Sequence, residues 1–127
     1  MIGLAPGDAP HLYIEVSRAD AATVLTLRGE IDVYTVPRLR SSIQGALDHG
    51  AKNLIVNLEA LEFTDSQGLG ALMAGWKLAR SNGGALLLAA VPKQVAKALA
   101  ITGLVRYLKA FPDTAAALAH LKRTEAA

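Results

Sequence analysis

Two short polar segments contain the side chains that could do chemistry. One is residues 29–32, with the sequence GEID, and the other is residues 64–68, with the sequence TDSQG. Each follows a strand-like stretch and precedes a helical pattern. In α/β proteins, ligand and chemical sites gather beyond the carboxyl ends of the strands. We therefore expect both segments at one edge of a sheet, with Ser66 as the central residue of the site.

Ser66 is expected at or near the N-cap of the helix that follows it. Unpaired backbone N–H groups of Gly68, Leu69 and Gly70 should point toward it, and the helix dipole favours an added negative charge there. A phosphate on Ser66 would add roughly −1.5 to −2 charges. The helix end could accept this charge without unfolding, whereas a docked partner would feel its bulk and its sign. This chemistry supports a surface switch at constant fold.

The same residues also have a purely structural interpretation. Asp65 and Ser66 would then cap a helix, as these residue types commonly do. Gly68 and Gly70 would permit close packing. Capping and switching can coexist, so the residues by themselves leave both roles open.

The apolar patterns predict the strands that position these segments. Residues 12–17 and 23–28 flank a short polar turn, which predicts an antiparallel hairpin. Nearly continuous apolar runs at 54–58 and 85–89 are typical of strands buried on both faces of a parallel sheet. Residues 104–111 offer a last strand.

Apolar residues at helical spacing predict about four helices. Their expected limits are Thr35 and Gly50, Ser66 and Asn82, Pro92 and Gly103, and Pro112 for the start of the last helix. The element order is therefore ββαβαβαβα. It predicts an α/β fold in which a mixed sheet of about five strands, opening with an antiparallel hairpin, is packed with helices.

Length and composition narrow the classes of protein that this chain can belong to. The 127 residues fit one domain; residues 1–10 are expected to be a flexible N-terminal lead-in and residues 11–124 the domain. Thirteen basic against eleven acidic residues give a net charge of +2, and no basic run is dense enough to make nucleic acid an expected direct partner. The absence of cysteine excludes disulfides and thiolate metal sites.

The sequence also bears on location. No apolar run approaches the length of a membrane span. The N-terminus lacks the basic stretch and long apolar core of a signal peptide. We therefore expect a cytoplasmic protein without a membrane partner.

A serine at a strand-to-helix turn is also typical of the nucleophile elbow of serine hydrolases. The glycine that this motif requires two residues before the serine is Thr64 instead. His49 and His120 are expected at the opposite edge of the sheet, and His11 belongs to the flexible start of the chain. With no histidine placed to act as a base, we expect no catalytic residues and no enzyme.

A response-regulator receiver, whose aspartate accepts phosphate beside Mg²⁺, is a second alternative. Glu30, Asp32, Asp65 and Lys109 are partial counterparts of its site. The opening hairpin and the two alanines at residues 89–90 disagree with it. No set of His, Asp or Glu has metal-ligand spacing and no Walker-type phosphate loop is present, so no metal or cofactor is expected.

Several segments in order resemble the STAS domain. They are residues 29–32, the strand at 54–58 and residues 63–69 (FTDSQGL), extended by the glycine pair at 83–84 and by residues 101–104. The resemblance covers about residues 12–121. More narrowly, the chain is similar to free-standing bacterial anti-sigma factor antagonists.

This resemblance implies partner switching. In the family, the serine directly after the aspartate is phosphorylated by the anti-sigma factor, a serine kinase, and that position is Ser66 here. The unphosphorylated protein binds the anti-sigma factor and frees sigma, the phosphorylated form releases it, and a phosphoserine phosphatase restores the first state. Asp32 and Asp65 match acidic positions of the family's docking face. The expected partner-binding residues are Glu30, Asp32, Thr64, Asp65, Ser66, Gln67, Gly68 and Leu69.

Gln67 departs from the pattern, because many members carry Ser or Thr at this position. Glutamine keeps the polarity but adds bulk beside the phosphate acceptor, which bears on kinase pairing. Some STAS proteins act as unphosphorylated adaptors in lipid transport, stress complexes or anion transporters, so a scaffold role remains an alternative. The sequence does not specify an oligomeric state.

Overall fold

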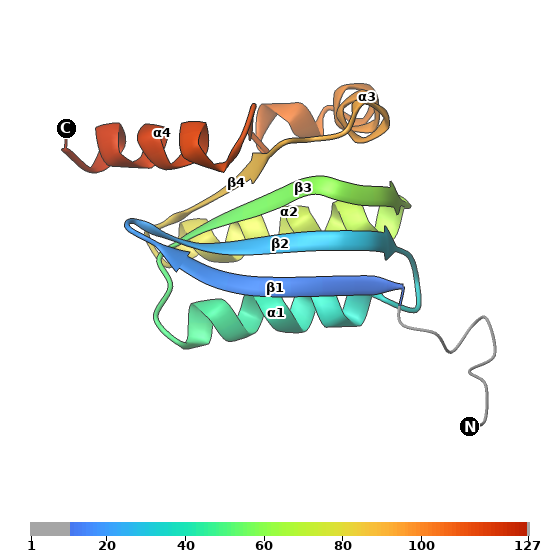
Figure 1. The fold of residues 1–127 in the computed structure, drawn as a ribbon, viewed down its shortest axis with the longest axis horizontal. Coiled ribbons are helices and arrows are strands. Elements are labelled where there is room, and N and C mark those ends of the chain that lie inside the picture. Colours follow the sequence, from blue (N-terminus) through green and yellow to red (C-terminus); the bar gives the residue numbers. More distant parts are fainter. Residues whose placement is uncertain (1–10, 127) are drawn as a thin grey trace.

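The computed structural model describes residues 11–126, and this part of the chain contains five strands and four α-helices in the order ββαβαβαβα (Figure 1). The expected lead-in, residues 1–10, lies outside it. The strands are β1 (Leu12–Ala19), β2 (Ala22–Ile31), β3 (Asn53–Thr64), β4 (Ala85–Ala89) and β5 (Ala110–Phe111). The helices are α1 (Val36–Asp48), α2 (Ser66–Ser81), α3 (Lys93–Thr102) and α4 (Thr114–Ala126), with a 3₁₀ turn, η1 (Leu104–Arg106), before β5. None of the described helices has the length and apolar character needed to cross a membrane.

The five strands form one mixed sheet in the order β1-β2-β3-β4-β5. β1 and β2 make the expected antiparallel hairpin, and the remaining neighbours are parallel. Because β2 and β3 are parallel, their carboxyl ends meet at the same edge, which lies on the right in Figure 1. The predicted α/β architecture and element order are confirmed.

The two faces of the sheet carry separate hydrophobic clusters. Along β3, Leu54 and Val56 enter the cluster that α1 and α2 cover, whereas Ile55 enters the cluster that α4 covers. All three side chains are fully buried, as the continuous apolar run predicts for a strand covered on both faces. In Figure 1 the sheet separates α4 from α1 and α2.

Two strands differ from their predicted lengths. β3 continues to Thr64 instead of ending near residue 58, because it stays paired with β2 across two register shifts. Residues 104–111 do not form a single strand. The N–H of Leu108 bonds back to the Leu104 carbonyl at 2.9 Å, which turns the chain and brings Leu108 into the core. After this turn, only Ala110–Phe111 pairs with β4, a strand of five residues.

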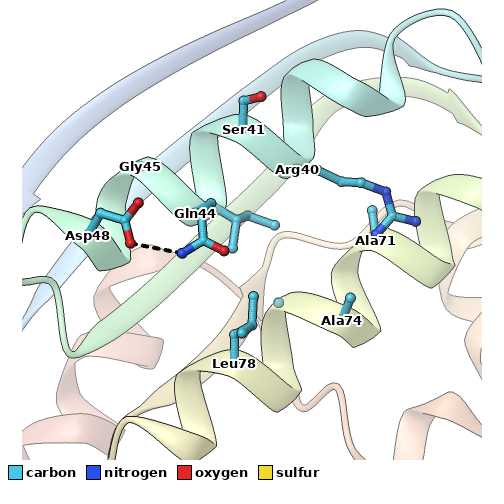
Figure 2. A pocket seen from close by; sticks show the side chains of 10 residues that line it. Arg40, Ser41, Gln44, Gly45, Asp48, Ala71, Ala74 and Leu78 are labelled. Atoms are coloured by element: carbon cyan, nitrogen blue, oxygen red, sulfur yellow. Dashed lines mark hydrogen bonds between the residues drawn. The ribbon is translucent and has the colours of Figure 1, made fainter.

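A shallow groove of about 510 Å³ lies between α1 and α2. Figure 2 shows its lining of small and aliphatic side chains from α2 facing Arg40, Gln44 and Asp48 of α1. The Gln44 amide donates a hydrogen bond to the Asp48 carboxylate at 2.8 Å. The lining includes no residue of either polar segment, so the groove is separate from the expected site.

The packing of α2 against the sheet can be tested with two leucines of the same helix. Leu72 is fully buried and Leu78 is 39% exposed. We expect Leu72→Ala to lower the free energy of unfolding by about 2–5 kcal/mol, because the substitution leaves a cavity in the core. Leu78→Ala should cost at most about 1 kcal/mol. Chemical denaturation of both variants measures the difference, and equal losses would contradict the orientation of α2.

Candidate functional site

The two polar segments lie side by side at the carboxyl edge of the sheet. β2 and β3 end in register, with Ile31 opposite Thr64. The N–H of Asp65 then donates a hydrogen bond to the Ile31 carbonyl at 3.1 Å. This bond ties the turn before α2 to the end of β2. The expected meeting of the two segments is confirmed.

Asp65, rather than Ser66, caps α2. Its backbone is extended, and its Oδ1 accepts hydrogen bonds from the N–H groups of Gln67 (2.9 Å) and Gly68 (3.2 Å). Ser66 is the first residue of the helix and is exposed. Within residues 11–126, its hydroxyl has no hydrogen-bond partner. The capping and the candidate acceptor roles therefore fall on two neighbouring residues.

Gly68 and Leu69 lie beneath the turn rather than on its surface. A Cβ on Gly68 would collide with the Thr64 hydroxyl and would lie 2.8 Å from the Ile31 side chain. Leu69 is 6% exposed and belongs to the main core cluster. Both residues were expected to bind a partner. Because they are buried, they can contribute to binding by holding the turn in place. Gln67 is exposed beside Ser66.

The segment after β2 is held by a compact set of hydrogen bonds. Oδ1 of Asp32 accepts from the N–H groups of Tyr34 (2.9 Å) and Thr35 (3.0 Å). The Thr35 hydroxyl accepts from the Asp32 N–H (2.9 Å) and donates to the Glu30 carbonyl (3.0 Å). Thr35 occupies the expected N-cap position of α1, but its side chain makes no capping bond. Its hydroxyl instead closes the loop that carries Glu30 and Asp32.

Exposed apolar side chains border the polar residues at this edge, and sequence reasoning missed them. Val33 is 53%, Tyr34 79% and Phe63 48% exposed. Phe63 lies opposite Glu30 in the strand register. Exposed aromatic and aliphatic groups beside charged ones are typical of protein contact surfaces. The available signal was two apolar residues directly after Asp32, between the strand and the helix.

His11 lies at the same edge, although the sequence suggested that it belongs to the flexible start of the chain. Its carbonyl accepts a hydrogen bond from the Glu30 N–H at 2.6 Å. One ligand atom from each of His11, Glu30 and Asp32 lies within 4.8 Å of the other two. The sequence predicted no metal site and did not bring these three residues together. The grouping is not visible in the sequence, because the hairpin brings His11 next to residues that lie about 20 positions further along the chain.

The other two histidines lie where the sequence predicts. His49 follows α1, and its Nδ1 lies 2.8 Å from the Gly45 carbonyl oxygen. It precedes β3 and Ser66 follows β3, a strand of 12 residues that spans roughly 36 Å. The His120 ring lies 5.0 Å from that of Phe111 and lines a depression beside the start of β3. Neither histidine can serve Ser66 as a base.

The family model of the STAS domain matches residues 13–117. The chain belongs to the STAS domain family. The anti-sigma-B factor antagonist of Staphylococcus aureus is 33% identical to this STAS domain over 94 residues, which are 74% of the chain and 87% of the relative. The anti-sigma F factor antagonist of Paenibacillus polymyxa is 26% identical over 113 residues, 88% of the chain and 97% of the relative.

Solved structures agree with this assignment. An anti-sigma factor antagonist from Mycobacterium paratuberculosis superposes on the STAS domain with a TM-score of 0.81 and 26% identity, covering 93% of this chain and 97% of that one. The unphosphorylated form of the anti-sigma factor antagonist SpoIIAA gives a TM-score of 0.72 at 23% identity, covering 91% and 98%. The latter shares the fold.

The cap of α2 gives a direct test of the site's geometry. Asp65→Ala should lower the free energy of unfolding by about 0.5–2 kcal/mol, because the N–H groups of Gln67 and Gly68 lose their acceptor. Asp65→Asn should lose much less, since its side-chain oxygen can accept the same bonds. Urea denaturation of the two variants measures both values. If asparagine costs as much as alanine, the hydrogen bonds are not the source of the stabilisation.

Proposed function

We propose that this chain is an anti-sigma factor antagonist. It binds an anti-sigma factor and thereby frees a sigma factor, and phosphorylation of Ser66 ends the binding. The names of the Staphylococcus aureus and Paenibacillus polymyxa relatives support this role. The observation that carries the switch is that Ser66 is exposed at the first position of α2. Its hydroxyl is not engaged elsewhere within residues 11–126.

The partner contacts a docking surface at the carboxyl edge of the sheet. This surface comprises Glu30, Asp32, Val33, Tyr34, Phe63, Thr64, Asp65, Ser66 and Gln67. It combines three exposed apolar side chains with three carboxylates, and aromatic anchors within a polar rim are typical of protein interfaces. Gly68 and Leu69 support the surface from below.

A phosphate on Ser66 acts on the partner and leaves the fold unchanged. Asp65 already occupies the N–H groups of Gln67 and Gly68 through Oδ1, and its carbonyl accepts from Leu69 at 3.4 Å. Two of the amides that the sequence suggested for the phosphate, those of Gly68 and Leu69, are therefore engaged. The added charge stays outward, beside the Asp65 carboxylate. A docked partner would meet both its volume and its repulsion.

Ser66 is a substrate of its partner in this account. The anti-sigma factor, a serine kinase, transfers a phosphoryl group from ATP to the Ser66 hydroxyl, and a phosphoserine phosphatase removes it. Gln67 is exposed on the first turn of α2. Its extra bulk therefore contacts the kinase and does not have to fit into the core. Gln67 therefore bears on kinase pairing and not on stability.

Phosphate transfer is tested with the candidate anti-sigma factor, ATP and mass spectrometry. We expect one phosphate on Ser66 of the native chain and none on Ser66→Ala. Ser41→Ala is the matched control, because Ser41 is an exposed serine of α1 and its loss should change nothing. Phosphate on any other residue, or none at all, would exclude the switch. A chain that binds the anti-sigma factor without being phosphorylated would instead be an adaptor.

The charge mechanism is tested by binding and stability together. Ser66→Ala should bind the anti-sigma factor within about twofold of the native affinity and change the free energy of unfolding by less than about 0.5 kcal/mol, because the hydroxyl bonds to none of the described residues. Ser66→Asp should fold equally well and bind at least about tenfold more weakly, a cost of about 1.4 kcal/mol. Ser41→Asp controls for added charge elsewhere. Equal affinities of Ser66→Ala and Ser66→Asp would refute a charge switch.

A further inference from the structure

Three side chains with different metal-binding groups converge where β1 begins and β2 ends. One ligand atom each from the His11 imidazole, the Glu30 carboxylate and the Asp32 carboxylate lies within 4.8 Å of the others. All three residues are half-buried. Glu30 and His11 also line a shallow depression of about 280 Å³, which leaves the cluster open to solvent. The sequence separates these residues, and the hairpin register brings them together.

The backbone holds His11 and Glu30 together independently of their side chains. The Glu30 N–H donates to the His11 carbonyl at 2.6 Å. Gly29, with a φ of +106°, has no side chain, and a Cβ there would collide with the same carbonyl. This close approach places the two ligand-bearing residues beside each other before any ion is bound.

Within residues 11–126, the hydrogen bonds that orient the Asp32 carboxylate fall on one of its two oxygens. Oδ1 accepts from the N–H groups of Tyr34 and Thr35, at 2.9 and 3.0 Å. The other oxygen, Oδ2, accepts no hydrogen bond from the described residues and can bind a ligand. Outer-sphere hydrogen bonds of this kind fix the orientation of metal-binding carboxylates. The loop therefore supplies a preset oxygen donor.

We propose that His11, Glu30 and Asp32 bind a divalent transition-metal ion of the Zn²⁺ class. An imidazole nitrogen with two carboxylate oxygens suits such ions better than Mg²⁺ or Ca²⁺, which take oxygen ligands. Donors at 2.0–2.2 Å from Zn²⁺ lie roughly 3.4 Å apart in a tetrahedral site. The ligand atoms now lie within 4.8 Å of one another, so binding requires the three side chains to rotate closer together. Three protein ligands leave a fourth position for water or another group.

The site changes the charge of the docking surface without touching Ser66. Glu30 and Asp32 belong to that surface, and a bound divalent ion neutralises their two charges. Ile31, between them, pairs with Thr64, two residues before Ser66. Metal binding here does not depend on the proposed function, because it rests on the three side chains and the backbone that places them.

Titration calorimetry with Zn²⁺ tests the site on the full chain prepared without a histidine tag. We expect one ion per chain, and binding at least about tenfold weaker in His11→Ala. Because the backbone carbonyl of His11, and not its ring, makes the sheet bond, this variant should keep its fold and unfolding temperature without metal. Glu30→Gln and Asp32→Asn should weaken binding in the same way.

His49→Ala and Glu59→Gln are the matched controls, since both residues are exposed and lie outside the cluster. They should bind Zn²⁺ with native affinity. The Co²⁺-loaded native chain should show visible absorption bands that disappear in His11→Ala. The proposal fails if His11→Ala binds Zn²⁺ as tightly as the native chain, if His49→Ala loses the ion, or if millimolar Zn²⁺ gives no binding.

Discussion

The parallel pairing of β2 with β3 is the constraint on which the site depends. It brings Ile31 opposite Thr64, so both strands end at one edge. The hydrogen bond from the Asp65 N–H to the Ile31 carbonyl extends that pairing into the turn, and Gly68 packs against the Ile31 side chain. A slip of one residue would move the Ile31 side chain to the other face of the sheet and remove it from the core. The burial of Ile31 thus fixes the strand register, and the register determines the position of Ser66.

This dependence also explains how much could be predicted from the sequence. The buried strands and the helix after Ser66 follow from local patterns, and the strand-to-helix turn follows from their order. The choice between Asp65 and Ser66 as the cap depends on the extended backbone at Asp65, which residue type alone does not determine. The approach of His11 to Glu30 depends on the hairpin register. The inward turn of residues 104–111 depends on the burial of Leu108 in the core, which the apolar run alone does not distinguish from a strand.

At this edge of the sheet, the side chains that stabilise the fold are different from the side chain that we propose is phosphorylated. Asp65 supplies the cap of α2, and Asp32 with Thr35 closes the neighbouring loop. Ser66 takes part in neither set within residues 11–126. A charge added to its hydroxyl therefore meets no structural bond that it could break. In our account, this division lets a modification alter recognition while the domain stays folded.

The most direct test of this division compares the unphosphorylated and the Ser66-phosphorylated chain by amide NMR and by affinity for the same anti-sigma factor. We expect chemical-shift changes confined to the turn before α2 and its first turn, with unchanged spectra for the sheet and α4. The affinity should fall at least about tenfold, roughly 1.4 kcal/mol. Shift changes spread through the sheet, or unchanged affinity, would contradict this division.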